Sequence, residues 1–114
     1  MPYNAQTSKL KRARNQRRAV LKLLAASLVL HKKIKTTYAK AKSVRPFIER
    51  LITVAKRDSL ASRRYVARFL PPTAIRPLHE LAVGYKDRAG GYVRIVKTIP
   101  RRVDNTKMAF IEFV

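Results

Sequence analysis

The chain of 114 residues contains no cysteine. This absence excludes a disulfide framework, a cysteine-ligated zinc site, an iron–sulfur cluster and a thiol nucleophile. Acidic residues are scarce, with 6 Asp and Glu against 27 Lys and Arg, and none are paired at a spacing that suits acid–base catalysis. Only three glycines are present, and Gly90-Gly91 lacks the spacing of a P-loop or a dinucleotide-binding turn.

Long hydrophobic runs are also missing. The longest apolar segment, residues 19–30, is interrupted by Lys22 and is too short to span a membrane. No small-residue cleavage site follows it cleanly, so we expect no secretory signal. His31 and His79 are far apart in sequence, and we expect the first near a helix C-terminus and the second on a solvated face. The sequence therefore predicts no enzyme, metal site, cofactor or small-molecule substrate.

Positive charge is abundant, with a formal net charge of +21. Because 46% of the residues are hydrophobic, a basic tail without a core is excluded. We expect residues 1–114 to form a single domain, with residues 1–9 as an extended, basic-flanked arm for RNA contact. A polyanion is the simplest partner that would neutralise such a charge.

The charge is unevenly distributed along the chain. Residues 1–57 hold 16 basic groups and a single acid, Glu49, whereas residues 58–114 hold 11 basic and five acidic groups. This asymmetry favours a nucleic-acid-binding N-terminal half. A mitochondrial transit peptide and a merely solvated charged face are the alternatives.

Apolar periodicity predicts about four helices. The first runs from a Thr7 or Ser8 cap to about Val29, and the second spans residues 38–56. The third runs from a Ser59 cap to about Phe69, and the fourth from a Thr73 cap to a C′ glycine at Gly84. Pro46 predicts a kink or a break in the second helix. In the first helix, Lys11, Arg14, Arg18 and Lys22 share one stripe, while Arg17 falls within the apolar sector.

Alternating residues predict strands at the end of the chain. Residues 92–97 and 107–114 read as a hairpin joined across residues 99–106, and residues 33–37 as a brief strand. The fold class is α+β, with about four helices packed on a small sheet that includes a C-terminal antiparallel hairpin. Around Gly90-Gly91, the guanidinium groups of Arg88 and Arg94 could bind phosphate, and the Tyr92 ring could stack on a splayed base.

Several separate motifs resemble the bacterial large-subunit ribosomal protein L-seventeen family. They are Ser27-Leu28-Val29, His31, Ile34-Lys35-Thr36-Thr37, Lys40-Ala41-Lys42, Arg45-Pro46, Glu49, Leu51-Ile52-Thr53, Asp87-Arg88-Ala89-Gly90-Gly91-Tyr92, Arg94-Ile95, Asp104-Asn105 and Met108-Ala109-Phe110-Ile111-Glu112. Their order and spacing agree from about Leu10 to Val114. The chain departs from the family pattern at Met1-Pro2-Tyr3, Gln16 and Val103, which suggests a divergent bacterial or organellar member.

The resemblance implies a structural constituent of the large ribosomal subunit, with helices packed on a small sheet and no enzymatic activity. Its expected partners are the large-subunit ribosomal RNA and neighbouring large-subunit proteins near the exit tunnel, on the peptide exit face. The expected localisation is cytoplasmic and ribosome-bound, with an organellar ribosome as the alternative.

We predict that binding is electrostatic, with recognition of shape rather than base sequence. The residues predicted to contact RNA through basic helix faces and loops are Lys9, Lys11, Arg12, Arg14, Arg17, Arg18, Lys35, Thr36, Thr37, Lys40, Lys42, Arg88, Arg94, Arg101 and Arg102. Two rival hypotheses are a DNA-binding architectural protein and a cationic membrane-surface protein built on the first helix.

Overall fold

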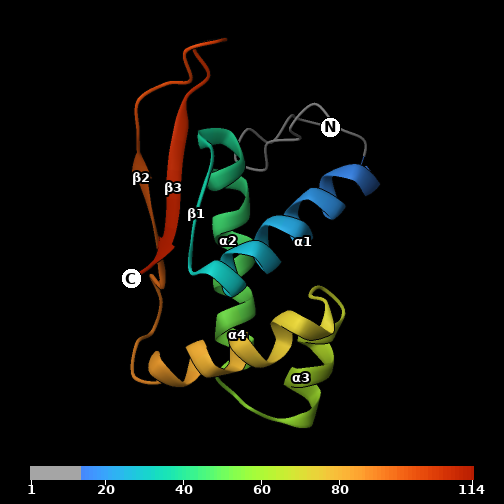
Figure 1. Cartoon of the computed structure of the whole chain (residues 1–114). Helices are drawn as coiled ribbons and strands as arrows, with labels where there is room; N and C mark the ends of the chain where they lie inside the picture. Colours follow the sequence, from blue (N-terminus) through green and yellow to red (C-terminus); the bar gives the residue numbers. More distant parts are fainter. Residues whose placement is uncertain (1–13) are drawn as a thin grey trace, which may run out of the picture.

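The computed structural model describes residues 14–114. In chain order its elements are α1 (Arg14–His31), β1 (Lys33–Thr37), α2 (Tyr38–Ala55), α3 (Leu60–Ala67), α4 (Pro72–Gly84), β2 (Val93–Lys97) and β3 (Met108–Phe113). The strands form one antiparallel sheet in the order β1-β3-β2, with the helices on one side of it (Figure 1). The predicted α+β class, the brief first strand and the C-terminal hairpin are confirmed.

Helix α2 lies at the centre of the molecule and contacts the other three helices and all three strands. Its residues at helical spacing, Ala41, Val44, Ile48, Leu51 and Ala55, are all buried, as the periodicity predicts. Of the kink or break predicted at Pro46, the break is not observed: the helix continues through the proline to Ala55. Packing on both sides of α2 compensates for the hydrogen bond that the proline ring removes.

Helices α3 and α4 show how the local capping rules apply. Ser59 caps α3 as predicted, and it forms a reciprocal capping box with Ser62 through hydrogen bonds of 3.1 and 2.9 Å. The prediction that Thr73 caps α4 is wrong: Pro71 is the N-cap and Pro72 is the first helical residue, a position where the missing N–H needs no partner. Gly84 is the last residue of α4 rather than its C′ glycine, and Tyr85 closes the helix with a negative φ.

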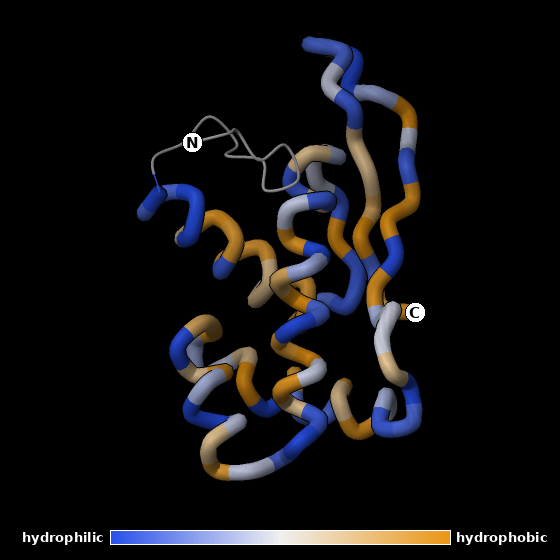
Figure 2. Tube along the Cα trace, turned by 180° about the vertical axis from the view of Figure 1, so that it is seen from behind, coloured by the Kyte–Doolittle hydropathy of each residue, from blue (hydrophilic) through white to orange (hydrophobic). Residues whose placement is uncertain are grey.

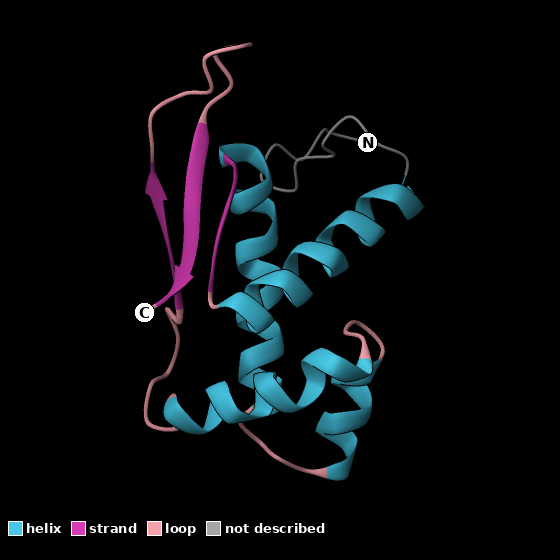
Figure 3. Cartoon of the chain, in the orientation of Figure 1, coloured by secondary structure: helices cyan, strands magenta, loops and turns pink. Residues whose placement is uncertain are grey.

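The two faces of the sheet differ in character. Ala109 and Ile111 of β3 are buried beneath the helices, together with Val93 of β2 and Thr36 of β1. The helices leave the opposite face uncovered (Figure 3). The pairing of β1 with β3 joins residues 33–37 to residues 108–112, and it turns the predicted hairpin into a three-stranded sheet.

Candidate nucleic-acid interface

Helix α1 presents a basic face without a single acid. Arg14, Arg18 and Lys22 are exposed, and Arg17 is half-buried. The buried residues of the helix, Ala25, Ala26, Leu28 and Val29, all lie in its second half. None of these four cations has an ion-pair partner among residues 14–114. The helix is therefore anchored by its second half, and its first half can offer its cations to a polyanion.

A second basic group lies where α2 begins. Thr37 is the N-cap of α2, and its hydroxyl oxygen accepts a hydrogen bond from the Lys40 amide at 3.3 Å. The ammonium groups of Lys42 and Lys97 lie 5.4 and 4.9 Å from the centre of the Tyr38 ring. Lys40 is half-buried.

Thr36 differs from its neighbour Thr37. It is 9% exposed and pairs with the buried Ala109 on the inner face of the sheet. Thr36 is therefore a poor candidate for a phosphate contact.

The loop between β2 and β3 is a basic turn ordered by its own hydrogen bonds. Arg101 donates to the Asp104 carboxylate at 3.1 Å, and the Thr106 amide donates to the same oxygen at 3.2 Å. Hydrogen bonds from Thr106 and Arg101 lower the pKa of Asp104 from 3.8 to about 2. Asn105 adopts a φ of 55°, a left-handed conformation that asparagine tolerates. Arg102 remains exposed beside this pair.

The turn between α4 and β2 is held in place by hydrogen bonds from Lys56. The Lys56 ammonium donates to the Arg88 carbonyl and to the Tyr92 hydroxyl, the latter at 2.9 Å. This hydrogen bond from Lys56 lowers the pKa of Tyr92. The prediction that the Tyr92 ring stacks on a base is wrong, because the side chain is fully buried. The exposed Arg88 guanidinium lies over the Tyr85 ring at 5.7 Å.

A further group lies on the uncovered face of the sheet. Glu112 of β3 accepts from Arg94 of β2 at 2.9 Å and lies 4.0 Å from the Lys33 ammonium of β1. Next to it, the Lys33 and Lys35 ammonium groups lie 4.5 and 5.9 Å from the centre of the Phe110 ring. One aromatic ring thus has two cations of β1 over it, and Arg94 of β2 lies on the same face of the sheet.

These groups do not form a single cluster. The tip of the hairpin, the start of α2 and the first turns of α1 lie toward one end of the molecule, and the turn between α4 and β2 lies toward the other (Figure 1). Figure 2 shows the same separation from behind, with hydrophilic residues at the hairpin tip and at the start of α1. The structure therefore separates Arg88 from Arg101 and Arg102. Lys9, Lys11 and Arg12 lie outside the described residues.

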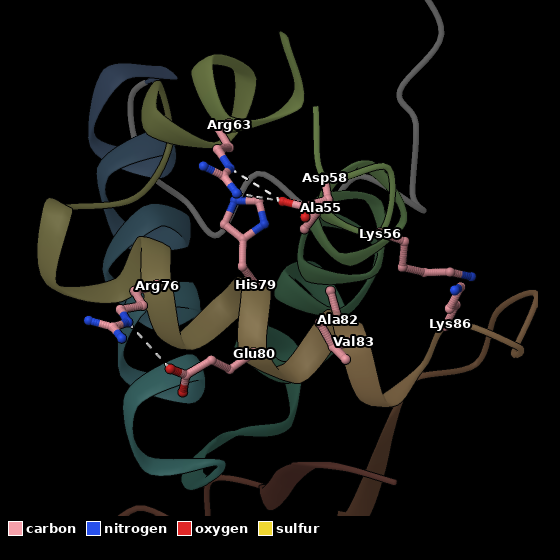
Figure 4. A pocket seen from close by; sticks show the side chains of 10 residues that line it. All are labelled: Ala55, Lys56, Asp58, Arg63, Arg76, His79, Glu80, Ala82, Val83 and Lys86. Carbon is pink, nitrogen blue, oxygen red and sulfur yellow. Dashed lines mark hydrogen bonds and ion pairs between the residues drawn. The ribbon is translucent and has the colours of Figure 1, made fainter. Parts of the chain in front are cut away.

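A hollow of about 370 Å³ between α3, α4 and the end of α2 offers a different chemistry (Figure 4). Its charges are largely paired, Arg63 with Asp58 at 2.9 Å and Arg76 with Glu80 at 3.5 Å. The hydrogen bond from Arg63 lowers the pKa of Asp58. The expectation that His79 is solvated is wrong, because both ring nitrogens are buried. Lys56 and Lys86 also line the hollow, and neither has a carboxylate partner among the described residues, so the paired charges outnumber the unpaired ones there.

His31 behaves as expected at the end of α1, where its Nδ1 lies 2.9 Å from the Ser27 carbonyl oxygen. No group of three residues able to hold a metal occurs in the part of the chain that the structure describes. Within the same residues, no helix has the length and apolar character needed to cross a membrane.

Sequence reasoning missed two cations, Lys33 and Lys97. Lys33 could have been found from alternation alone, since it lies two residues before Lys35 and therefore shares its face of the strand. The position of Lys97 beside Tyr38 depends on how the hairpin packs against α2, which no local pattern reveals.

Comparison with known proteins identifies the chain. Residues 20–114 match the family described as "Ribosomal protein L17". "Large ribosomal subunit protein bL17" of Hydrogenobaculum sp. (strain Y04AAS1) is 47% identical over 117 residues, covering 100% of this chain and 99% of that protein. The protein of that name from Mycoplasmopsis synoviae is 48% identical over 106 residues, covering 86% of this chain and 88% of that protein. The chain therefore belongs to the ribosomal protein L17 family, and it is a structural constituent of the large ribosomal subunit rather than an enzyme.

Proposed function

We propose that this protein binds the large-subunit ribosomal RNA through its basic helix faces and loops, near the peptide exit face. The observation that carries the proposal is α1, whose four cations have no acid on the helix and no ion-pair partner among residues 14–114. Neutralising phosphates there releases counterions, which gives affinity without base-specific readout. The exit-face location and the neighbouring large-subunit proteins rest on the family resemblance alone.

The proposal keeps residues 1–114 as one domain, with residues 1–9 as an arm toward RNA. Its contact residues are those predicted from the sequence, with Thr36 as the weakest member because it is buried. The protein would be ribosome-bound in the bacterial cytoplasm, which fits its bacterial relatives, with an organellar ribosome as the alternative.

Sucrose-gradient sedimentation of a cell lysate, with detection of this chain at low and high salt, tests the proposal. We expect the chain to migrate with the large subunit and to stay there at moderate salt. Recovery mainly with DNA, or at the top of the gradient, would contradict the proposal and favour the DNA-binding hypothesis.

Two variants sharpen this experiment. We expect Arg88→Ala to lower incorporation into the large subunit more than Arg76→Ala does, although both remove one exposed cation. Arg76 lies on α4 and pairs with Glu80, and such surface pairs contribute little to stability. Because Arg88 also donates to the Gly91 carbonyl at 3.4 Å, thermal unfolding of both variants must be compared. Equal incorporation of the two variants would contradict the assignment of the turn around Arg88 to the RNA interface.

A further inference from the structure

The uncovered face of the sheet carries one aromatic ring at its centre. Phe110 lies on the middle strand, and the register places Lys35 of β1 and Val96 of β2 on either side of it. These residues share the face opposite the buried Ala109 and Ile111, so the ring points away from the helices. Val96 is 44% exposed, and it extends the apolar surface beside the ring.

The cations on this face of the sheet come from both edge strands. The Lys33 and Lys35 ammonium groups lie 4.5 and 5.9 Å from the ring centre, and both residues are exposed. Arg94 reaches the same face from β2 and is held by Glu112. Flexible lysine side chains can leave the ring when another group stacks on it and still keep their charge nearby.

We propose that this face binds an unpaired nucleotide of RNA, with the base stacked on Phe110 and the phosphates held by Lys33, Lys35 and Arg94. The inference rests on the proposed RNA binding and deepens it. An RNA nucleotide combines an aromatic base with an anionic phosphate, and the face offers a partner for each. An acidic peptide would use the cations but would leave the ring without a stacking partner. A paired base is excluded, because only a base splayed out of its helix can lie flat on a ring.

The absence of tryptophan from the chain makes a direct test possible. Phe110→Trp introduces a single fluorescent reporter in the full chain, and Leu60→Trp places the same reporter at an exposed position at the start of α3. Each is titrated at low salt with an oligoadenylate of about ten nucleotides and with an abasic oligonucleotide of the same length. We expect the oligoadenylate to quench the Phe110→Trp signal, the abasic strand to leave it unchanged, and Leu60→Trp to respond to neither.

Affinity measurements provide the second readout. We expect Phe110→Leu to weaken oligoadenylate binding about 5- to 100-fold while abasic binding changes little, and Phe110→Tyr to restore the affinity because it keeps a ring. Equal losses on both strands, or no change in the Phe110→Trp signal on binding, would overturn the base-stacking site and leave RNA binding intact. If neither strand nor ribosomal RNA binds the unmodified chain at low salt, the proposed function fails as well. Circular dichroism of each variant separates these outcomes from unfolding.

Discussion

Asp104 shows how one side chain can organise a basic loop. Its carboxylate accepts hydrogen bonds from the Thr106 amide and from Arg101, so the arginine is held in the turn while its neighbour Arg102 is left without an ion-pair partner among the described residues. The pKa of Asp104 falls because both partners favour its charged form. The loop therefore displays its second arginine on a turn fixed by the first.

This arrangement predicts a specific pH dependence. A depressed pKa means that the carboxylate helps to hold the loop above its ordinary pKa of 3.8, and that this contribution is lost as the pH falls through about 2. An NMR titration of the Asp104 carboxyl should show a midpoint at about 2. Arg101→Ala should raise that midpoint only part of the way to 3.8, because Thr106 remains. Arg102→Ala is the control and should leave it unchanged. A midpoint near 3.8 in the unmodified chain would refute this account.

At the scale of one element, α1 combines its role in the core with an unfavourable charge distribution. Residues 14–31 of the helix hold four cations and no acid, and Arg14, Arg18 and Lys22 follow one another at i,i+4 spacing, where like charges repel. A bound phosphate would reverse this unfavourable interaction. The residues proposed to bind RNA are therefore expected to lower the stability of the free chain.

Charge reversal tests this trade-off directly. Arg14→Glu should raise the free energy of unfolding of the free chain by about 0.2 to 0.5 kcal/mol, because it replaces a like-charge pair with Arg18 by an i,i+4 ion pair. The same change should weaken RNA binding and lower its salt slope by about 0.7 to 0.9. Arg14→Gln is the matched control: it removes the charge without adding an anion, so it should weaken RNA binding with a smaller gain in stability. A loss of stability in Arg14→Glu would contradict the repulsion argument.

The elements differ in how far sequence alone predicted them. Helix α2 was predicted because its apolar residues recur at helical spacing. The packing of these residues overrides Pro46, so the helix continues through it. The start of α4 was mispredicted because Thr73 was taken as its cap, although proline also favours the first position of a helix, which here is Pro72. The pairing of β1 with β3 could not be derived, because local alternation identifies strands and not their partners.

The candidate site shows the same limit at the scale of the whole molecule. Local charge and spacing identified the cations of α1, the start of α2 and the hairpin loop. The grouping of Lys33, Phe110 and Arg94 depends on the register of three strands that are distant in sequence. Tyr92 was assigned to the surface because basic residues lie close to it in sequence, but it precedes β2 with its side chain fully buried and its hydroxyl accepting from Lys56.

The net charge of +21 affects the whole molecule through self-repulsion. Five of the six acids form ion pairs within residues 14–114, so most of the cations there have no carboxylate to neutralise them. Salt screens such exposed charges over about 10 Å at 0.1 M. Salt should therefore act in opposite directions on the free chain and on its complex with RNA.

Thermal unfolding of the free chain should shift upward between about 0.05 and 0.5 M NaCl, because screening relieves the repulsion. A gain of about 1 kcal/mol corresponds to a rise of roughly 4 °C for a chain of this size. Over the same range the affinity for ribosomal RNA should fall steeply, because releasing the same counterions into a more concentrated salt solution gains less free energy. The double variant Arg14→Glu with Arg18→Glu carries less positive charge and should show a smaller rise in Tm. If Tm is independent of salt, self-repulsion does not lower the stability of the free chain. The cations of this protein would then be tolerated without the polyanion that we propose as their partner.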